Sequence, residues 1–382
     1  MQGGSLESGT REAPTDRGVL IVTDDLVMGG MERQLTLLAT ALQTTSAVRV
    51  FSLGDGVYAP VLREAGVPLD VFARESRFDV KPALPLRRII SEWRPTVVHT
   101  FGWMSMAAAI VPCRLSGIPL VDGSIRDGAV PTRRGRLMQA MIARADVVIA
   151  NSQAGLDAFG VDPGKGRVVY NGFDPERWPL CRPGSAPDRP TTVIMTARMH
   201  CHKDYRGLLD AARILDAEAP GAWRFLAVGS GEDREALMAE YCDLIEGGVA
   251  EFPQAGTEVL SLVSASHIGV LLTDPRHHAE GLSNSIMEYM ACGLPVICTH
   301  GGGNSEVVVE GETGLFVAPG DTQAVVDALR ALRDDPATAA RMGAAGRERI
   351  RTVFTVDALV GGTVAAYDLA VERRRTRGRT PR

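Results

Sequence analysis

Two carboxylates eight residues apart, Glu280 and Glu288, lie in the run HHAEGLSNSIMEYMACGLPVICTHGGGNSE at residues 277–306. Between them, Ser283 and Asn284 are helix-capping residue types, so the pattern predicts a helix that begins between the two acids. The free N–H groups and positive dipole end of such a helix attract phosphate. Each carboxylate can also accept hydrogen bonds from a polyol. The arrangement suits a nucleoside diphosphate sugar, and it equally fits an amphipathic helix with one capping and one solvated glutamate.

The same helix has an apolar face. Leu282, Ile286 and Met290 recur every four positions and predict the side that packs against a sheet. Asn284 and Glu288 fall together on another side, and the two glutamates are separated by about 12 Å along the helix axis. The helix is therefore expected to bury one side while its N-terminal end holds a phosphate.

Three further segments could contact an anion. Arg198 and Lys203 follow a predicted strand, where two cations can neutralise a departing pyrophosphate without a metal ion or can simply be solvated. Gly29 and Gly30 precede a predicted helix and leave bare backbone N–H groups for an anion, or form only a tight turn. The run VGSG, residues 228–231, ends another predicted strand. The first strand is not followed by a GxGxxG pattern, which argues against an NAD enzyme.

The histidines do not predict a metal site. His200 and His202 are two positions apart, and ligands at that spacing point to opposite sides of an extended chain. With His277 and His278 they match no zinc pattern. We therefore expect no metal, with His278 lining a cleft. His99, at the end of a predicted strand, is either a cleft residue or a packing residue.

Length and composition fit a two-domain globular enzyme. The chain has 382 residues, 45% apolar and 23% charged, and a net charge of −5 that gives no case for nucleic acid as a partner. We find no apolar run of about 20 residues and no signal-peptide core. Unpaired cysteine spacing favours reduced thiols and a cytoplasmic location. The cysteines are Cys113, Cys181, Cys201, Cys242, Cys292 and Cys298.

Apolar strand-like runs alternate with amphipathic helix-like runs along the chain, in two series. This alternation implies parallel sheets covered on both faces, and hence an α/β fold with two Rossmann-like domains. Ligands bind such sheets at the carboxyl ends of the strands. The expected parts are a disordered N-terminus (1–17), a first domain (18–178), a Pro- and Arg-rich linker (179–190), a second domain (191–355), and a last helix with a basic tail (356–382).

The run EGLSNSIMEYMACGLPVICT resembles the Glu-x7-Glu motif of retaining glycosyltransferase family 4, and GLPVICTHGGGNSEVVVEGETGLFVAPGD continues that family's pattern. The resemblance implies the GT-B architecture, with two Rossmann-like parallel-sheet domains facing across a cleft and a last helix that crosses back. It also implies that Glu288 holds the ribose hydroxyls and Glu280 a hydroxyl of the donor sugar. The backbone amides expected to approach the sugar and phosphates are those of Gly281, Leu282, Ser283 and Asn284.

The resemblance extends to the other anion-binding candidates. It pairs Arg198 with Lys203 after the first strand of the donor domain, and it places the Gly-Gly element across the cleft from the diphosphate. Gly229 and Gly231 lie where the family wraps the nucleotide base. Family members of this kind are generally metal-independent, so no cofactor is expected.

One departure concerns the acceptor side. Many members carry a His after the strand equivalent to PLVDGSIRDG, where this chain has Arg126 and Asp127. Some branches of the family use a Ser-x-Arg pattern there. Arg126 is therefore expected to contact a phosphate or the acceptor, and Asp127 to orient the acceptor, with His99 as a further acceptor-side candidate.

The predicted function is transfer of a hexose-type sugar, with retention, from a UDP- or GDP-sugar to a hydroxyl acceptor, a glycan or a lipid-linked sugar, in cell-surface glycan synthesis. Glu280, Arg198 and Lys203 are the expected catalytic residues, acting by positioning and electrostatics. The alternatives are a non-catalytic nucleotide-sugar-binding subunit and a GT-B nucleotide-sugar epimerase.

Basic residues cluster in PTRRGRLMQAMIARA, with Arg133, Arg134, Arg136 and Arg144, and in the tail ERRRTRGRTPR. The first is a basic amphipathic helix that can rest on the anionic inner face of a membrane, or it is only a solvated helix face.

Overall fold

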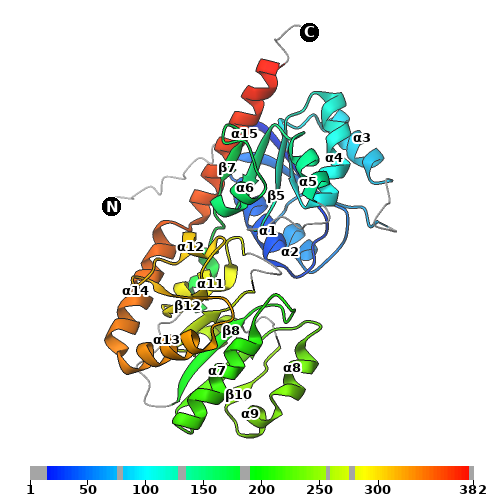
Figure 1. Ribbon diagram of the computed structural model, residues 1–382. Coiled ribbons are helices and arrows are strands. Elements are labelled where there is room, and N and C mark those ends of the chain that lie inside the picture. The colour runs from blue at the N-terminus through cyan, green and yellow to red at the C-terminus, as the bar shows by residue number, and fades with distance from the viewer. Residues whose placement is uncertain are drawn as a thin grey trace, which may run out of the picture. The chain divides into compact units, whose positions relative to one another are not determined.

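The computed structural model describes residues 15–74, 81–127, 135–180, 190–254, 259–274 and 280–377 (Figure 1). They form two parallel sheets with helices between the strands, as the alternation predicts. The first strand begins at Thr15, so residues 15–17 of the expected N-terminal tail are strand residues, and Arg17 forms an ion pair with Asp368. Residues 1–14, most of the expected linker, Arg133 and Arg134, and His277 and His278 lie outside the described residues.

The first sheet has seven strands in the order β3-β2-β1-β4-β5-β6-β7. Its pairs are parallel, and β4, β5 and β6 are buried throughout, which explains their unbroken apolar sequence. The strands are β1 (Thr15–Thr23), β2 (Ser46–Ser52), β3 (Leu69–Val71), β4 (Val97–Phe101), β5 (Leu120–Ile125), β6 (Val147–Ala150) and β7 (Gly166–Val168). The helices are α1 (Gly30–Leu42), α2 (Tyr58–Glu64), α3 (Ala83–Trp93), α4 (Trp103–Ser116), α5 (Gly135–Ile142) and α6 (Gln153–Ala158).

The second sheet has six strands in the order β10-β9-β8-β11-β12-β13, again parallel. They are β8 (Thr191–Thr196), β9 (Trp223–Val228), β10 (Ala250–Glu251), β11 (Ile268–Leu271), β12 (Val296–Thr299) and β13 (Gly314–Val317). The helices are α7 (Tyr205–Glu218), α8 (Arg234–Glu240), α9 (Cys242–Glu246), α10 (Val259–Ser264), α11 (Asn284–Ala291), α12 (Asn304–Val307), α13 (Thr322–Asp334) and α14 (Pro336–Thr352). A 3-10 helix, η1 (Pro175–Leu180), precedes β8, and α15 (Val356–Arg377) follows α14. Although all the strands are parallel, the order in which the chain adds them changes side between β8 and β11. Sheets of this kind bind ligands at such a point, beyond the carboxyl ends of the strands.

By spatial clustering the chain forms two compact units. Unit 1 comprises Met1–Asp122, Arg144–Asp146 and Tyr367–Arg382, and unit 2 comprises Gly123–Ala143 and Val147–Ala366. The division falls inside β5 and inside α15, and the domain boundaries expected from the sequence stay a prediction. Within the described part of the chain, no single helix is long and apolar enough to cross a bilayer, although α14 and α15, bent by 43°, meet that criterion when taken together.

The helix predicted between the two glutamates is α11, and it is buried on more than its predicted stripe. Besides Ile286 and Met290, the phenol ring of Tyr289 is fully buried, and its hydroxyl accepts a hydrogen bond from the Thr196 N–H at 2.6 Å. Gly269 on β11 makes room, because a Cβ there would lie 2.4 Å from the Tyr289 ring. Close packing on β8 and β11 therefore fixes the position of the N-terminus of α11.

Candidate active site

Lys203 and Glu280 form an ion pair at the carboxyl ends of β8 and β11. The ammonium of Lys203 donates to Glu280 Oε1, and the Thr273 hydroxyl donates to the same oxygen at 3.1 Å. The side chains of Lys203 and Glu280 are 11% and 12% exposed. A backbone bridge between Lys203 and Thr273 holds the two segments together. Two residues that the sequence singles out separately are thus direct partners.

Two opposing effects act on the charge of Lys203. Burial lowers the pKa of Lys203, and the negative charge of Asp127 acts in the opposite direction. Asp127 also forms an antiparallel backbone bridge with Glu280. A cation with little water around it gains strongly from an incoming diphosphate oxygen.

The N-terminus of α11 is held by a polar chain. The Asn171 side-chain amide donates to Leu282 O at 3.2 Å and to Asn284 Oδ1 at 3.1 Å. Arg126 Nη1 in turn donates to Asn171 Oδ1 at 3.3 Å. Ser283 is the N-cap residue as expected, but among the described residues its side chain makes no capping hydrogen bond. The chain thus connects the predicted acceptor-side Arg126 with the predicted donor-side residues.

Asn171 is a residue that sequence reasoning missed. It is 3% exposed and follows β7 in the run RVVYNG, where Asn-Gly indicates a turn. Its double role at the start of α11 could not be found from local pattern, because 111 positions separate it from Leu282.

Glu288 forms a second buried ion pair, with Arg177 of η1. Arg177 Nη1 lies 2.7 Å from Glu288 Oε1, and the two side chains are 24% and 7% exposed. Arg177 was also missed, because PERW at the end of the first series of elements carries no periodic signal. Both glutamates of the motif therefore have a cationic partner.

Gly281 is needed for close approach. A Cβ at this position would lie 2.1 Å from Arg126 O and 2.6 Å from Asn151 Oδ1. On its other side, the Gly303 N–H donates to Glu280 O at 2.8 Å. The backbone of the segment between Glu280 and α11 is therefore in close contact with its neighbours. A side chain at residue 281 would displace this segment from Arg126 and Asn151.

The VGSG run packs on the loop that carries Arg198. Cβ atoms at Gly229 and Gly231 would lie 2.0 Å from Ala197 O and 2.1 Å from Met199 O, and the Met199 N–H donates to Ser230 O at 2.9 Å. Arg198 itself is exposed. The structure thus brings together the predicted base-binding run and one of the predicted diphosphate ligands.

Gly29, Gly30 and His99 belong to unit 1. Gly29 is the N-cap of α1, and a Cβ there would lie 2.0 Å from Glu32 Oε2, so the Glu32 carboxylate covers this helix end. His99 is 1% exposed; its Nδ1 is 2.9 Å from the Tyr367 hydroxyl, and its ring packs on Phe101. His99 is thus a residue of the core of unit 1.

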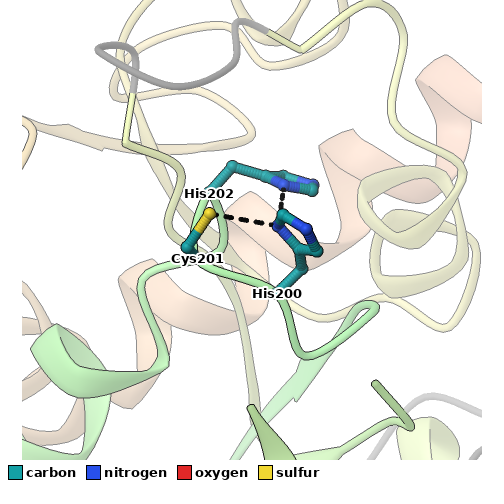
Figure 2. Close-up of side chains that lie close together, drawn as sticks. All are labelled: His200, Cys201 and His202. Carbon is teal, nitrogen blue, oxygen red and sulfur yellow. Dashed lines mark hydrogen bonds between the residues drawn. The ribbon is translucent and has the colours of Figure 1, made fainter. Parts of the chain in front are cut away.

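The structure overturns the geometric reason for excluding a metal at His200 and His202. Residues 200–203 form a turn, not an extended segment, and His200 Nδ1 and His202 Nδ1 lie 2.9 Å apart with the Cys201 sulfur beside them (Figure 2). Five cysteines, all except Cys181, lie among the described residues, and none of these five is in a disulfide.

A polar cavity of about 590 Å³ adjoins Lys203. Two cations, Lys203 and Arg206, line it, but four carboxylates outnumber them; these are Asp204, Asp210, Asp233 and Asp274. Because these negative charges repel a diphosphate, the cavity is a poor candidate for the donor, and the N-terminus of α11 is a better one.

Comparison with known proteins agrees with this site. A family model described as Glycosyl transferases group 1 matches residues 190–335, and one described as Glycosyltransferase Family 4 matches residues 28–177. The glycogen synthase of Mycobacterium tuberculosis is 27% identical over 314 residues, 77% of this chain and 74% of that protein. The D-inositol 3-phosphate glycosyltransferase of Rhodococcus jostii is 28% identical over 309 residues, 72% of this chain and 66% of that protein.

The fold is also similar to solved structures. Anabaena HepE in complex with UDP superposes with a TM-score of 0.79 at 20% identity, covering 92% of this chain and 99% of that chain. Two parallel-sheet α/β domains with such neighbours define the GT-B class. Together with the two family matches, this establishes that the chain belongs to the group 1 and family 4 glycosyltransferases, and it is a glycosyltransferase.

Proposed function

We propose that this glycosyltransferase moves a hexose-type sugar, with retention of anomeric configuration, from a UDP- or GDP-sugar to a hydroxyl acceptor. The observation that carries the proposal is the N-terminus of α11, which lies between two glutamates that are each paired with a cation. Anabaena HepE, solved with UDP and with UDP-glucose, supports a nucleotide-sugar donor of this kind.

Each part of the donor has a partner in this arrangement. Glu288 holds the ribose hydroxyls and Glu280 a hydroxyl of the sugar. The diphosphate rests on the backbone N–H groups at the start of α11, where the helix dipole favours negative charge. Arg198 and Lys203 stabilise the charge that develops on the diphosphate as it leaves.

In the transfer step, the bond between the anomeric carbon and the diphosphate oxygen breaks, and a bond from the acceptor oxygen forms on the same face. The acceptor proton passes to the departing diphosphate, so no protein base is required. The protein contributes position and charge stabilisation. Because Arg198 and Lys203 supply the positive charge, the transfer needs no metal ion.

The acceptor is proposed to be a glycan or a lipid-linked sugar of a cell-surface polymer, with Arg126 and Asp127 on its side of the site. Arg136 on α5 is exposed, and its neighbour Leu137 is 64% exposed. A cation beside an exposed apolar residue suits the surface of an anionic membrane, which fits a cytoplasmic enzyme bound to the inner leaflet. The protein should sediment with anionic but not zwitterionic liposomes, and a Leu137→Glu variant should stay in the supernatant.

The first experiment is a donor panel. We would incubate the protein with UDP-, GDP- and ADP-sugars and hydroxyl acceptors, measure nucleoside diphosphate release with and without EDTA, and determine the anomer of the product by NMR. Release from one donor in the presence of EDTA, with a retained anomer, is the expected result. Glu280→Gln should abolish release, whereas Glu251→Gln, on the edge strand β10, should not change it.

Each deviation has a distinct meaning. An inverted product would contradict retention, and loss of release in EDTA would contradict metal independence. Tight nucleotide binding without release from any donor–acceptor pair would favour a binding subunit over a transferase.

A further inference from the structure

The turn before Lys203 gathers three metal-ligating side chains. The ligand atoms of His200, Cys201 and His202 all lie within 4.8 Å of one another. His200 Nδ1 is 3.2 Å from Cys201 Sγ and 2.9 Å from His202 Nδ1. In Figure 2 the dashed lines from the Cys201 sulfur and from the His202 ring both end on the His200 ring. Nothing in the proposed transfer reaction uses these three side chains.

Glu232 fixes the orientation of one ligand. Its Oε1 lies 2.9 Å from His200 Nε2, the ring nitrogen opposite the cluster. A carboxylate at this nitrogen holds the proton there and leaves Nδ1 as the free electron pair that faces Cys201 and His202. Metal-bound histidines usually donate this second N–H to a carboxylate, a backbone carbonyl or water, which fixes the ring and raises the basicity of the ligand.

We propose that His200, Cys201 and His202 bind one Zn²⁺ ion through two imidazole Nδ1 atoms and one thiolate, with Glu232 orienting His200. An imidazole–thiolate set suits zinc, whose usual ligands are Cys and His. With bonds of about 2.0 Å to nitrogen and 2.3 Å to sulfur, tetrahedral ligand atoms are about 3.3–3.6 Å apart. Two of the present separations, 2.9 and 3.2 Å, are a few tenths of an ångström shorter than this. All the ligand atoms lie within 4.8 Å of one another, so rotation of the side chains has to bring the three to that geometry.

The residues around the cluster favour a cation, and the adjoining cavity gives a metal ion access to Cys201. Cys201 is exposed and lines the cavity of about 590 Å³ that Asp204, Asp233 and Asp274 also line. Four aspartates and two cations, Lys203 and Arg206, line the cavity, so its charge is net negative and attracts a dication. Three protein ligands leave the fourth position of zinc to water or to a ligand that enters from the cavity.

Bound zinc would stiffen the loop that carries two proposed catalytic residues. The Lys203 N–H donates to His200 O at 2.8 Å, and the Asp274 N–H donates to His202 O at 3.0 Å. The ion thus closes a turn that is already tied to Lys203 on one side and to the end of β11 on the other. None of the zinc ligands is a proposed donor ligand, so zinc binding and sugar transfer can be measured separately.

The test uses the full chain without an affinity tag, stripped of metal by a chelator. Zinc affinity and stoichiometry are measured by competition with a chromophoric chelator, and Co²⁺ is used as a spectroscopic probe of thiolate ligation. We expect one site per chain and a thiolate-to-Co²⁺ charge-transfer band. Metal binding should also release the thiol proton, which calorimetry in two buffers detects.

Variants separate this site from adventitious binding. Cys201→Ser should lose the charge-transfer band, and His202→Gln should lose most of the affinity. Glu232→Gln should weaken zinc binding about 10- to 100-fold. Cys242→Ser, at another exposed cysteine on α9, is the matched control and should bind as the wild type does. Zinc binding that Cys201→Ser and His202→Gln leave unchanged, or a Co²⁺ spectrum without the thiolate band, would overturn the proposal.

Discussion

The buried pair Arg177–Glu288 should stabilise unit 2 far more than an exposed pair of the same length. We compare it with Arg224–Glu251, which joins β9 to β10. The closest N···O distance is 2.7 Å in both pairs, but the side chains are 24% and 7% exposed in the first and 47% and 45% in the second. The exposed pair makes two parallel hydrogen bonds, at 2.8 and 2.9 Å, so burial is the difference that favours Arg177–Glu288.

The expected loss of unfolding free energy depends on which charged group each substitution leaves without a partner. Arg177→Leu leaves the Glu288 carboxylate buried without its cation, and losing one partner of a buried pair costs about 3–5 kcal/mol. Since Arg177 is a quarter exposed, we expect a loss of about 2–4 kcal/mol of unfolding free energy. Glu288→Leu should cost less, because the remaining guanidinium can turn toward solvent. Arg224→Leu should cost less than about 1 kcal/mol.

The assay is urea unfolding followed by tryptophan fluorescence and circular dichroism. Trp178 adjoins Arg177, with its ring 4.9 Å from that of Phe173, and Trp223 adjoins Arg224, so each pair has a nearby reporter in unit 2. The double variant of Arg177 and Glu288 should lose less than the sum of the single variants, by about 1–3 kcal/mol. Equal losses for Arg177→Leu and Arg224→Leu would refute burial as the reason.

Three further predictions test other parts of the chain. Asp24 accepts hydrogen bonds from the Met104 and Ser105 N–H groups at the start of α4, so Asp24→Ala should lower the free energy of unfolding by about 1–3 kcal/mol, measured by the same urea assay; an unchanged midpoint would contradict this. Gly281→Ala should abolish nucleotide binding measured by calorimetry, because the added Cβ would clash with backbone atoms. Gly361→Ala in α15, where no heavy atom lies near the added Cβ, is the control and should bind nucleotide normally. Equal affinities of the two variants would contradict this. Burial lowers the pKa of His267, whose Nδ1 accepts a hydrogen bond from the Thr192 N–H, so the folded state disfavours the protonated ring. The contribution of His267 to the free energy of unfolding should be complete above about pH 6.5 and fall at lower pH. In urea midpoints measured from about pH 7 to pH 5, His267→Gln should make that fall less steep.

Much of the fold was predictable because it is local in the sequence. Alternating apolar runs gave the two parallel sheets, and the spacing of Leu282, Ile286 and Met290 gave α11, with Ser283 as its N-cap residue. The all-round burial of α11 was not predictable, because it depends on Gly269 of β11 accepting the ring of Tyr289. Sequence spacing reports one face of a helix, whereas the packing partner decides how many faces are covered.

The site was predictable residue by residue but not in its pairings. Glu280, Glu288 and Lys203 stood out by type and position, yet the partner of Glu288 came from Arg177, in a segment without periodicity. The prediction that no metal binds at the histidines stays untested, but its geometric premise was wrong. It assumed an extended chain through His200 and His202, whereas the segment turns there and brings both rings to one side.

The two ion pairs would allow a helix end flanked by acids to receive the proposed diphosphate. Two buried carboxylates beside the N-terminus of α11 would repel a dianion and cancel the attraction of the helix dipole. Lys203 and Arg177 each contact Oε1 of their glutamate, which neutralises the charge nearby. The contacts described for Glu280 all fall on that one oxygen, so Oε2 can accept a hydroxyl of the sugar. The same carboxylate can thus bind a sugar without repelling the phosphate next to it, and removing Lys203 should weaken nucleoside diphosphate binding more than removing Glu280 does.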